Sequence, residues 1–468
     1  MVTELTEHCK KILPRSIRPR RALTPPPTYL ANHLNPSVPN SPPSAITSPF
    51  LNLLAVLAVG LGASVGPLDF AVNVAFPAIS AAFQIQTQTI RWVALFYVLT
   101  YGSLVLWFGA LGDRIGHLRV FRLGLVLGAI AFALCAVSPF YSWLLAARVL
   151  QGISAALILS CGPALVTFLY AEHERTRALS MYGSMAGLAT VAAPLIGGYS
   201  IAWMGWTGAY WIRVPIVLVA LACLALHNPR LQHAGHGIVD GTKKTESLST
   251  IQLLLNTLRS NSNFGWVNAS CVIVQLCSFS IPLILPYYLI RVLHWNSAQS
   301  GGLLVAWALG GLAGAAATPA LVRRFGLNQT GFIAACFCCL GLLAMCFWSS
   351  SVSVPFMVLS IAIQGTGLGL FQVVYSDWMM ADLPPQSRGV AGSLAVLTRM
   401  LGIVTGAVCW LWLVDRGEAS ALAAGQTPEA AFLAGYQQLH YVVASVSVGF
   451  FTLSCFKRGL WFRAAPSP

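Results

Sequence analysis

After residue 49 the chain alternates between long apolar runs and short polar turns. Residues 90–108 contain Arg91 as their only charged side chain, and residues 123–141 contain none. A helix of about 20 apolar residues is long enough to cross the hydrocarbon core of a bilayer. The pattern predicts twelve membrane spans, at residues 50–78, 90–110, 119–138, 142–164, 179–203, 207–227, 266–290, 299–322, 330–350, 354–378, 389–414 and 436–456. An even number of spans places both termini on one side of the membrane.

The composition is that of a multi-pass membrane protein. Hydrophobic residues make up 57% of the chain, charged residues 9%, and the mean hydropathy is +0.72. Soluble domains carry about 25% charged residues. The sequence therefore predicts an all-α membrane protein.

The net charge of +14 reports orientation in the membrane and not affinity for nucleic acid. Most of the 27 Lys and Arg residues lie in the tails and in the turns on the side of the termini. This asymmetry follows the positive-inside rule and favours contact with anionic lipid. We expect a protein of the plasma or inner membrane with both termini in the cytoplasm and no nucleic-acid partner.

The polar segments divide the chain into five parts. Residues 1–49 are rich in proline and arginine and contain no apolar run long enough for a signal sequence, so we expect a disordered cytoplasmic tail; a transit peptide is the alternative. Residues 228–265 are predicted to be a cytoplasmic linker between two six-helix bundles, 50–227 and 266–456. Residues 457–468 form a second cytoplasmic tail.

No pattern of catalytic or metal-binding residues stands out. The twelve cysteines lie mostly in apolar runs, where cysteine is a small hydrophobe, and adjacent Cys338 and Cys339 point to different helix faces. The stretch Gly365–Gly369 resembles a nucleotide-binding loop but has no preceding strand and no Lys-Ser/Thr pair. We expect no enzyme activity, no metal and no cofactor.

A charged turn at residues 109–122 separates the second and third predicted spans. Asp113 in it can cap a helix or pair with an arginine of the turn or a charge on a neighbouring helix. The turn is similar to G-x-L-a-D-r-x-G-r-k, the signature between helices 2 and 3 of the major facilitator superfamily, with His117 and Leu118 where basic residues are usual. The resemblance implies two parallel six-helix bundles and a conformational switch at Gly109, Asp113, Arg114, Gly116 and Arg119.

The first span carries an acid, Asp69, within Gly66–Pro77. This stretch resembles L-D-x-T-x-x-N-V-A-x-P of the drug:proton antiporter branch, whose members usually have fourteen helices. Asp69 lies one residue nearer Asn73 than is usual, which turns it by about 100° unless the Gly66-Pro67 break compensates. An ionised carboxylate is costly in a membrane, so we expect Asp69 to be paired, to face water or to be protonated.

Two further helices resemble the same branch. Helix 4 carries Arg148 and Gln151 in the pattern R-x-x-Q-G, and Arg148 lies at a depth similar to that of Asp69, so the two can pair. Helix 2 carries Trp92 and Tyr97; Trp92 also suits an anchor at the lipid interface. These residues are candidates for proton coupling or substrate binding.

The remaining candidates lie in helices 5, 6 and 11. Pro194, Gly197 and Gly198 resemble the antiporter signature g-x-x-x-G-P-x-x-G-G, although a bend and a close-packed helix seam explain them equally well. Arg213 replaces an asparagine that is usual in the branch. Arg399 begins a stretch that resembles R-x-x-G-x-x-x-G.

The second half of the chain repeats the first at an offset of about 210. Residues 111–116 return as 321–326, Gln151-Gly152 as Gln364-Gly365, and Phe76-Pro77 as Leu285-Pro286. Such repeats are typical of transporters with two parallel halves. Ser278 takes the place of Asp69 in the repeat, so the ionisable residues concentrate in the first half.

These features predict a secondary active transporter that works by alternating access. The resemblance implies proton-coupled efflux of small hydrophobic or drug-like compounds, driven by a proton gradient, by a protein that functions as a monomer. A symporter or uniporter for an organic acid or sugar is one alternative, because three arginines within the spans would suit an anionic substrate. A membrane sensor that does not transport is the other.

Overall fold

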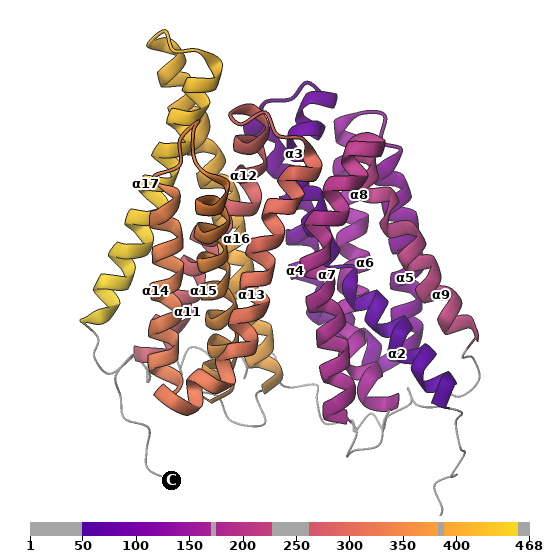
Figure 1. The fold of residues 1–468 in the computed structure, drawn as a ribbon. Helices are drawn as coiled ribbons and strands as arrows, with labels where there is room; N and C mark the ends of the chain where they lie inside the picture. Colours follow the sequence, from indigo (N-terminus) through magenta and orange to yellow (C-terminus); the bar gives the residue numbers. More distant parts are fainter. Residues whose placement is uncertain (1–48, 170–174, 227–261, 382–387, 457–468) are drawn as a thin grey trace, which may run out of the picture. The chain divides into compact units, whose positions relative to one another are not determined.

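The computed structural model describes residues 49–169, 175–226, 262–381 and 388–456, and within these ranges every regular element is a helix. The tail before residue 49, the tail after residue 456 and most of the predicted linker lie outside the described residues. The helices described belong to one compact unit. In Figure 1, α2 begins and α17 ends at the lower end of the helices, as an even number of spans requires. We call this the inner end and the opposite one the outer end.

The first half contains six helical stretches, several of them broken into shorter pieces. Their bounds are α2 (Pro49–Ser64), η2 (Pro67–Asp69), α3 (Phe70–Ala82), η3 (Thr87–Ile90), α4 (Arg91–Ile115), α5 (His117–Ala136), α6 (Tyr141–Leu169), α7 (Arg175–Met204), η5 (Gly205–Thr207), α8 (Gly208–Trp211) and α9 (Arg213–Leu226).

The second half repeats this arrangement with fewer breaks. Its helices are α11 (Ser262–Ser278), α12 (Ser280–Arg291), α13 (Ser297–Phe325), α14 (Leu327–Met345), α15 (Val354–Ala381), α16 (Arg388–Ala423) and α17 (Pro428–Cys455). The helices of the two halves lie on opposite sides in Figure 1, with α7 and α13 in contact between them.

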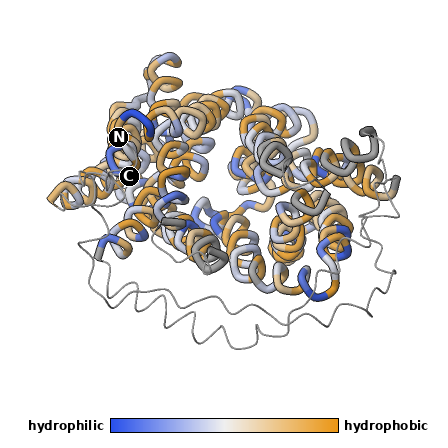
Figure 2. Tube along the Cα trace, turned by 90° about the horizontal axis from the view of Figure 1, so that it is seen from below, coloured by the Kyte–Doolittle hydropathy of each residue, from blue (hydrophilic) through white to orange (hydrophobic). Residues whose placement is uncertain are grey.

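Ten of the described stretches are long and apolar enough to cross a membrane. An eleventh comprises Thr87–Val105 and Trp107–Ile115, and Arg213–Ala225 is a shorter apolar helix. Each of these twelve stretches overlaps one of the twelve predicted spans. Figure 2, seen from the inner end, shows that most of the chain in the helices is hydrophobic and that hydrophilic residues form short stretches.

Glycine makes the tight inner turns possible. Gly116 ends α4 and precedes α5 with φ +100°, and Gly326 joins α13 to α14 with φ +83°. Backbone angles of this kind are strained for residues with a Cβ atom. The two glycines are 210 residues apart, which is the offset of the sequence repeat.

Two boundaries differ from the prediction. The predicted span 389–414 is part of a longer helix that continues to Ala423, so Ser420, which the predicted spans leave between two helices, lies within α16. The predicted span 207–227 is not one helix, because η5, α8 and α9 follow each other with a break at Ile212. Polar helical turns beyond the apolar run carry no hydropathy signal, which explains the first difference.

Candidate functional site

Asp69 lies where the first membrane helix is interrupted. Pro67 has no N–H group to continue the hydrogen bonding of α2, which ends at Ser64, and the short η2 turn carries the chain to α3 at Phe70. The backbone N–H of Asp69 donates to Gly66 over 3.0 Å. The side chain is 14% exposed and points into the first half of the protein, toward helices α6 and α9.

Arg148 of α6 binds this carboxylate with both ends of its guanidinium group. Nη1 donates to Oδ1 over 2.6 Å and Nη2 donates to Oδ2 over 2.8 Å. Nε donates to the carbonyl oxygen of Val93 over 2.8 Å, and the guanidinium carbon lies 4.5 Å from the ring centre of Tyr97. Paired donors of this kind fix the geometry of a carboxylate. The predicted pairing of Asp69 with Arg148 is present in the structure.

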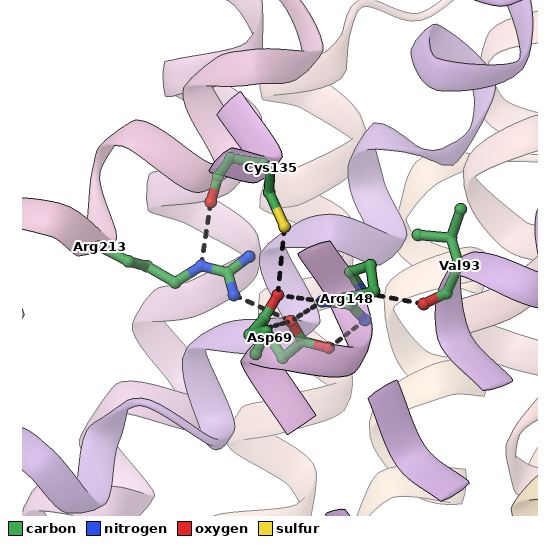
Figure 3. Close-up of polar contacts among 7 residues, drawn as sticks. Asp69, Val93, Cys135, Arg148 and Arg213 are labelled. Carbon is green, nitrogen blue, oxygen red and sulfur yellow. Dashed lines mark hydrogen bonds and ion pairs between the residues drawn. The ribbon is translucent and has the colours of Figure 1, made fainter. Parts of the chain in front are cut away.

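A second arginine, Arg213 at the start of α9, binds the same carboxylate oxygen. Nη1 donates to Oδ1 of Asp69 over 2.8 Å, and Nε donates to the carbonyl oxygen of Ala209 over 3.0 Å. The guanidinium group lies over the rings of Phe132 and Tyr210, at 5.1 and 5.3 Å from their centres. Figure 3 shows Asp69 between the two arginines.

Gln151 completes this group, which we call the Asp69 cluster: Asp69, Arg148, Gln151 and Arg213. Its Nε2 donates to Oδ1 of Asp69 over 2.8 Å, while its Oε1 accepts from Arg148 over 2.7 Å. The Cys135 thiol lies 3.9 Å from the same Oε1. The sequence did not point to Cys135 or Ala209. Cys135 is a small side chain in an apolar run, and Ala209 contributes only its backbone carbonyl oxygen.

The Asp69 cluster holds two guanidinium groups and one carboxylate. Both arginine side chains are 1% exposed, and Nη2 of Arg213 has no hydrogen-bond partner among the described residues. Removing one member of a buried ion pair costs about 3–5 kcal/mol, because the other charge is left without compensation. Any loss of charge on Asp69 therefore changes the stability of the contacts among η2, α6 and α9.

The second half contains an uncharged copy of this arrangement. Gln364 donates from Nε2 to Oγ of Ser278 over 2.6 Å, as Gln151 donates to Asp69. Trp307 donates to Oε1 of Gln364 over 2.5 Å and lies 210 residues after Tyr97. The helix is again interrupted at this point, since α11 ends at Ser278 and α12 begins at Ser280. The repeat offset, applied to Tyr97, would have identified Trp307.

The halves meet at the outer end and in the middle of the helices. Oγ of Ser80 on α3 and the Tyr287 hydroxyl on α12 lie 2.6 Å apart, and the rings of Phe70 and Trp307 pack edge to face at 5.7 Å. A pocket of about 870 Å³ lies beside the first contact and is lined by Tyr287, Asp415 and other residues of both halves. Asp69 does not line it.

Residues 51–407 match the sequence profile of the Major Facilitator Superfamily. The chain belongs to this superfamily. A riboflavin transporter, RibZ, of Clostridioides difficile strain 630 is 24% identical over 392 residues, covering 75% of this chain and 86% of RibZ. A methylenomycin A resistance protein of Bacillus subtilis strain 168 is 35% identical over 173 residues, covering 36% of this chain and 37% of that protein.

The fold agrees with solved structures of transporters. The nucleoside transporter NupG superposes with a TM-score of 0.68 at 11% sequence identity, covering 87% of this chain and 99% of NupG. At this identity the likeness concerns the fold alone. The profile match over residues 51–407, together with the apolar helices, makes the chain a multi-pass transporter of the major facilitator superfamily.

The superfamily turn has a different partner from the one expected. Asp113 lies in the last turn of α4, and its Oδ1 lies 3.4 Å from Nε2 of His117, so it pairs with neither Arg114 nor Arg119 in the described contacts. The side chains of Asp113, Arg114 and Arg119 are exposed. His117 stands at a position that is usually basic in the superfamily. Its imidazole takes the place of that basic group as the contact of Asp113.

The helix 5 motif forms a seam between the halves. A Cβ atom on Gly198 would lie 2.5 Å from the carbonyl oxygen of Ser297, and one on Gly301 would lie 2.1 Å from that of Pro194. Gly197 packs in the same way against Ala71 of α3. Small residues thus let α7 contact α13 at backbone distance. The close-packed seam that was one interpretation of the motif is present.

Three candidates lie away from the Asp69 cluster. Asn73 is buried one turn further along α3 and does not bond to Asp69. Trp92 is 40% exposed beside Arg91, as an interface anchor would be. Arg399 lies on α16 in the other half of the protein.

Proposed function

We propose that the protein exports small hydrophobic or drug-like compounds across the cell membrane in exchange for protons. The observation that carries the proposal is Asp69, a carboxylate in the interior of the first half that is held by two arginines from two other helices. The partial similarity to a methylenomycin A resistance protein supports export as the direction. We also propose that both termini are cytoplasmic and that a monomer is functional.

In this mechanism the proton binds to Asp69 while the site is open to the outer side. The neutral carboxyl group no longer compensates Arg148 and Arg213, so the contacts that join η2, α6 and α9 weaken. Helix α3 follows directly after Asp69 and contacts α12 of the other half, so a change at Asp69 reaches the boundary between the halves. The proton is released to the inner side, and the substrate crosses in the opposite direction.

The test is transport by the purified protein in proteoliposomes under an imposed pH gradient. The probes are ethidium, an aromatic cation, fluorescein, an aromatic anion, and methylenomycin A. We expect Asp69→Asn to abolish accumulation of the transported probe against its gradient while exchange of that probe without a gradient persists. Ser278→Ala is the matched control, because it changes the equivalent uncharged position and should keep accumulation.

A structural role for Asp69 would give a different result. Asp69→Asn would then lose thermal stability and exchange together with accumulation. If the single variant does not fold, the double variant Asp69→Asn/Arg213→Asn removes one of the two uncompensated cations and allows the same measurement. Wild-type accumulation by either folded variant would show that Asp69 does not couple transport to protons.

A further inference from the structure

Arg399 is a partly buried charge for which the described residues supply no counterion. It lies on α16, is partly buried, and its Nε atom is fully buried with no hydrogen-bond partner among the described residues. In those residues it also forms no ion pair. A cation at this position in a membrane protein is costly unless something compensates it.

Two stacked tyrosines of the other half face the same region. The rings of Tyr97 and Tyr101, one turn apart on α4, lie 6.3 Å apart at an angle of 15°. The guanidinium group of Arg148, in the Asp69 cluster, lies over the ring of Tyr97, and the charge of Arg399 acts on the hydroxyl of Tyr101. The pair therefore connects the Asp69 cluster with Arg399.

The contact between α4 and α16 places these groups at the boundary of the halves. A Cβ atom on Gly102 would lie 3.2 Å from Cγ of Met400, so the residues next to Tyr101 and Arg399 touch. Alternating access requires a substrate to contact both halves, since its binding must stabilise one arrangement of them over another. Tyr101 supplies an aromatic surface from one half and Arg399 a guanidinium group from the other.

The balance of charge in the described helices indicates which substrates fit. Arg148, Arg213 and Arg399 lie in their interior, and Asp69 compensates the first two only in part. Even with Asp69 ionised, the interior keeps an excess of positive charge. An anion is therefore the better match for Arg399 than a cation.

We propose that Tyr97, Tyr101 and Arg399 form a binding site for planar aromatic anions. The anionic group of the substrate accepts hydrogen bonds from the Arg399 guanidinium, and its ring packs against Tyr101. This inference rests on the proposed transport function and names the substrate class. Three arginines within the spans suit an anionic substrate, and Arg399 is the one of the three that has no hydrogen-bonded or ion-paired side-chain partner among the described residues.

The test is equilibrium binding to the purified protein in nanodiscs without a pH gradient. The probes are 2-naphthoate, its neutral amide 2-naphthamide, and the non-aromatic cyclohexanecarboxylate. We expect the wild type to bind 2-naphthoate about ten- to a hundredfold more tightly than 2-naphthamide, the range that hydrogen bonds to a charged group provide. Cyclohexanecarboxylate should bind more weakly than 2-naphthoate, because it cannot stack on Tyr101.

Variants separate the contributions of charge and ring. Arg399→Gln should reduce 2-naphthoate binding to that of 2-naphthamide, Arg399→Lys should restore part of it, and Tyr101→Leu should weaken the binding of both aromatic probes. Leu397→Ala, an exposed change on the same helix, is the control. If Arg399→Gln does not fold, the comparison of 2-naphthoate with 2-naphthamide on the wild type decides.

Equal binding of the acid and the amide by the wild type would overturn the proposal, as would wild-type affinity in folded Arg399→Gln. The outcome is independent of the coupling mechanism. A protein that exports ethidium under a pH gradient but does not bind 2-naphthoate keeps the proposed function and loses this inference. If the protein binds 2-naphthoate but a pH gradient does not drive its transport, this inference stands and the proposed function fails.

Discussion

At Asp69 one carboxylate oxygen accepts three hydrogen bonds, from Arg148, Gln151 and Arg213. The carboxylate is therefore held more strongly than the pair with Arg148 alone would hold it. Arg213 stands where an asparagine is usual in the antiporter branch that the sequence resembles. Its effect is to oppose protonation of Asp69, since a nearby cation favours the charged form of an acid.

We therefore expect Arg213→Asn to move the pH profile of proton-driven transport toward higher pH. One cation fewer lets Asp69 bind a proton at a lower proton concentration, and a shift of one pH unit corresponds to about 1.4 kcal/mol of lost interaction. Initial rates measured against outer pH check this. Arg416→Gln, which changes an exposed outer arginine, should leave the profile in place. An unchanged profile in Arg213→Asn would mean that Arg213 serves packing alone.

The contact between Asp69 and Arg148 could be predicted from the sequence, because it depends on the depth of each residue along its helix. Asp69 and Arg148 could be placed at one level by counting residues from the ends of their spans. The bond from Arg213 could not be foreseen, because its direction depends on the break at Ile212 between α8 and α9. Asp69 is the last residue of the η2 turn, whose tighter winding no hydrophobic pattern reports.

At the scale of elements, the seam between α7 and α13 depends on glycine. We expect Gly301→Val to leave insertion intact but to slow transport at least tenfold, because the new side chain would overlap the backbone at Pro194 and separate the two helices. The neighbouring Gly302→Val is a matched control, since a Cβ atom there meets open space. Equal rates for the two variants would show that the seam does not take part in transport. Transport and expression are measured together.

The inner turn gives a second prediction for an element. Asp113→Asn removes the acid from its contact with His117 and should slow transport several-fold without affecting insertion, because a charge that helps hold one conformation is lost. Asp377→Asn, at another exposed acid near the end of α15, is the control. Transport at the normal rate in Asp113→Asn, with normal expression, would make the turn an ordinary loop.

Element boundaries were predictable only where apolar and polar residues alternate sharply. The turns at Gly116 and Gly326 were predictable, because charged residues stand close to a glycine at both places. Helix α16 extends past the predicted end because Asp415, Arg416 and Glu418 lie on turns that leave the apolar run without ending the helix. The breaks after Ser64 and Ser278 belong to the repeat, and Pro67 marked the first of them in advance.

For the whole molecule, the predicted orientation can be tested with single cysteines in a variant whose twelve native cysteines are replaced. Position 236 should react only with reagents added from the cytoplasmic side. Ser420, which is exposed near the end of α16, should react only from outside. Reaction of both from the same side would contradict the arrangement of twelve spans.

The uncharged Ser278–Gln364 pair has a consequence for transport stoichiometry. The second half cannot hold a proton where the first half can, and the other carboxylates of the described helices, such as Asp113 and Asp415, lie toward helix ends. If Asp69 is the coupling group, one proton enters per transport cycle. Each unit of pH difference then supplies about 1.4 kcal/mol, which without a membrane potential sets a thermodynamic ceiling of about tenfold accumulation of a neutral compound per pH unit. For a monovalent anion the exchange moves two charges per cycle, so the membrane potential adds about 4.6 kcal/mol per 100 mV.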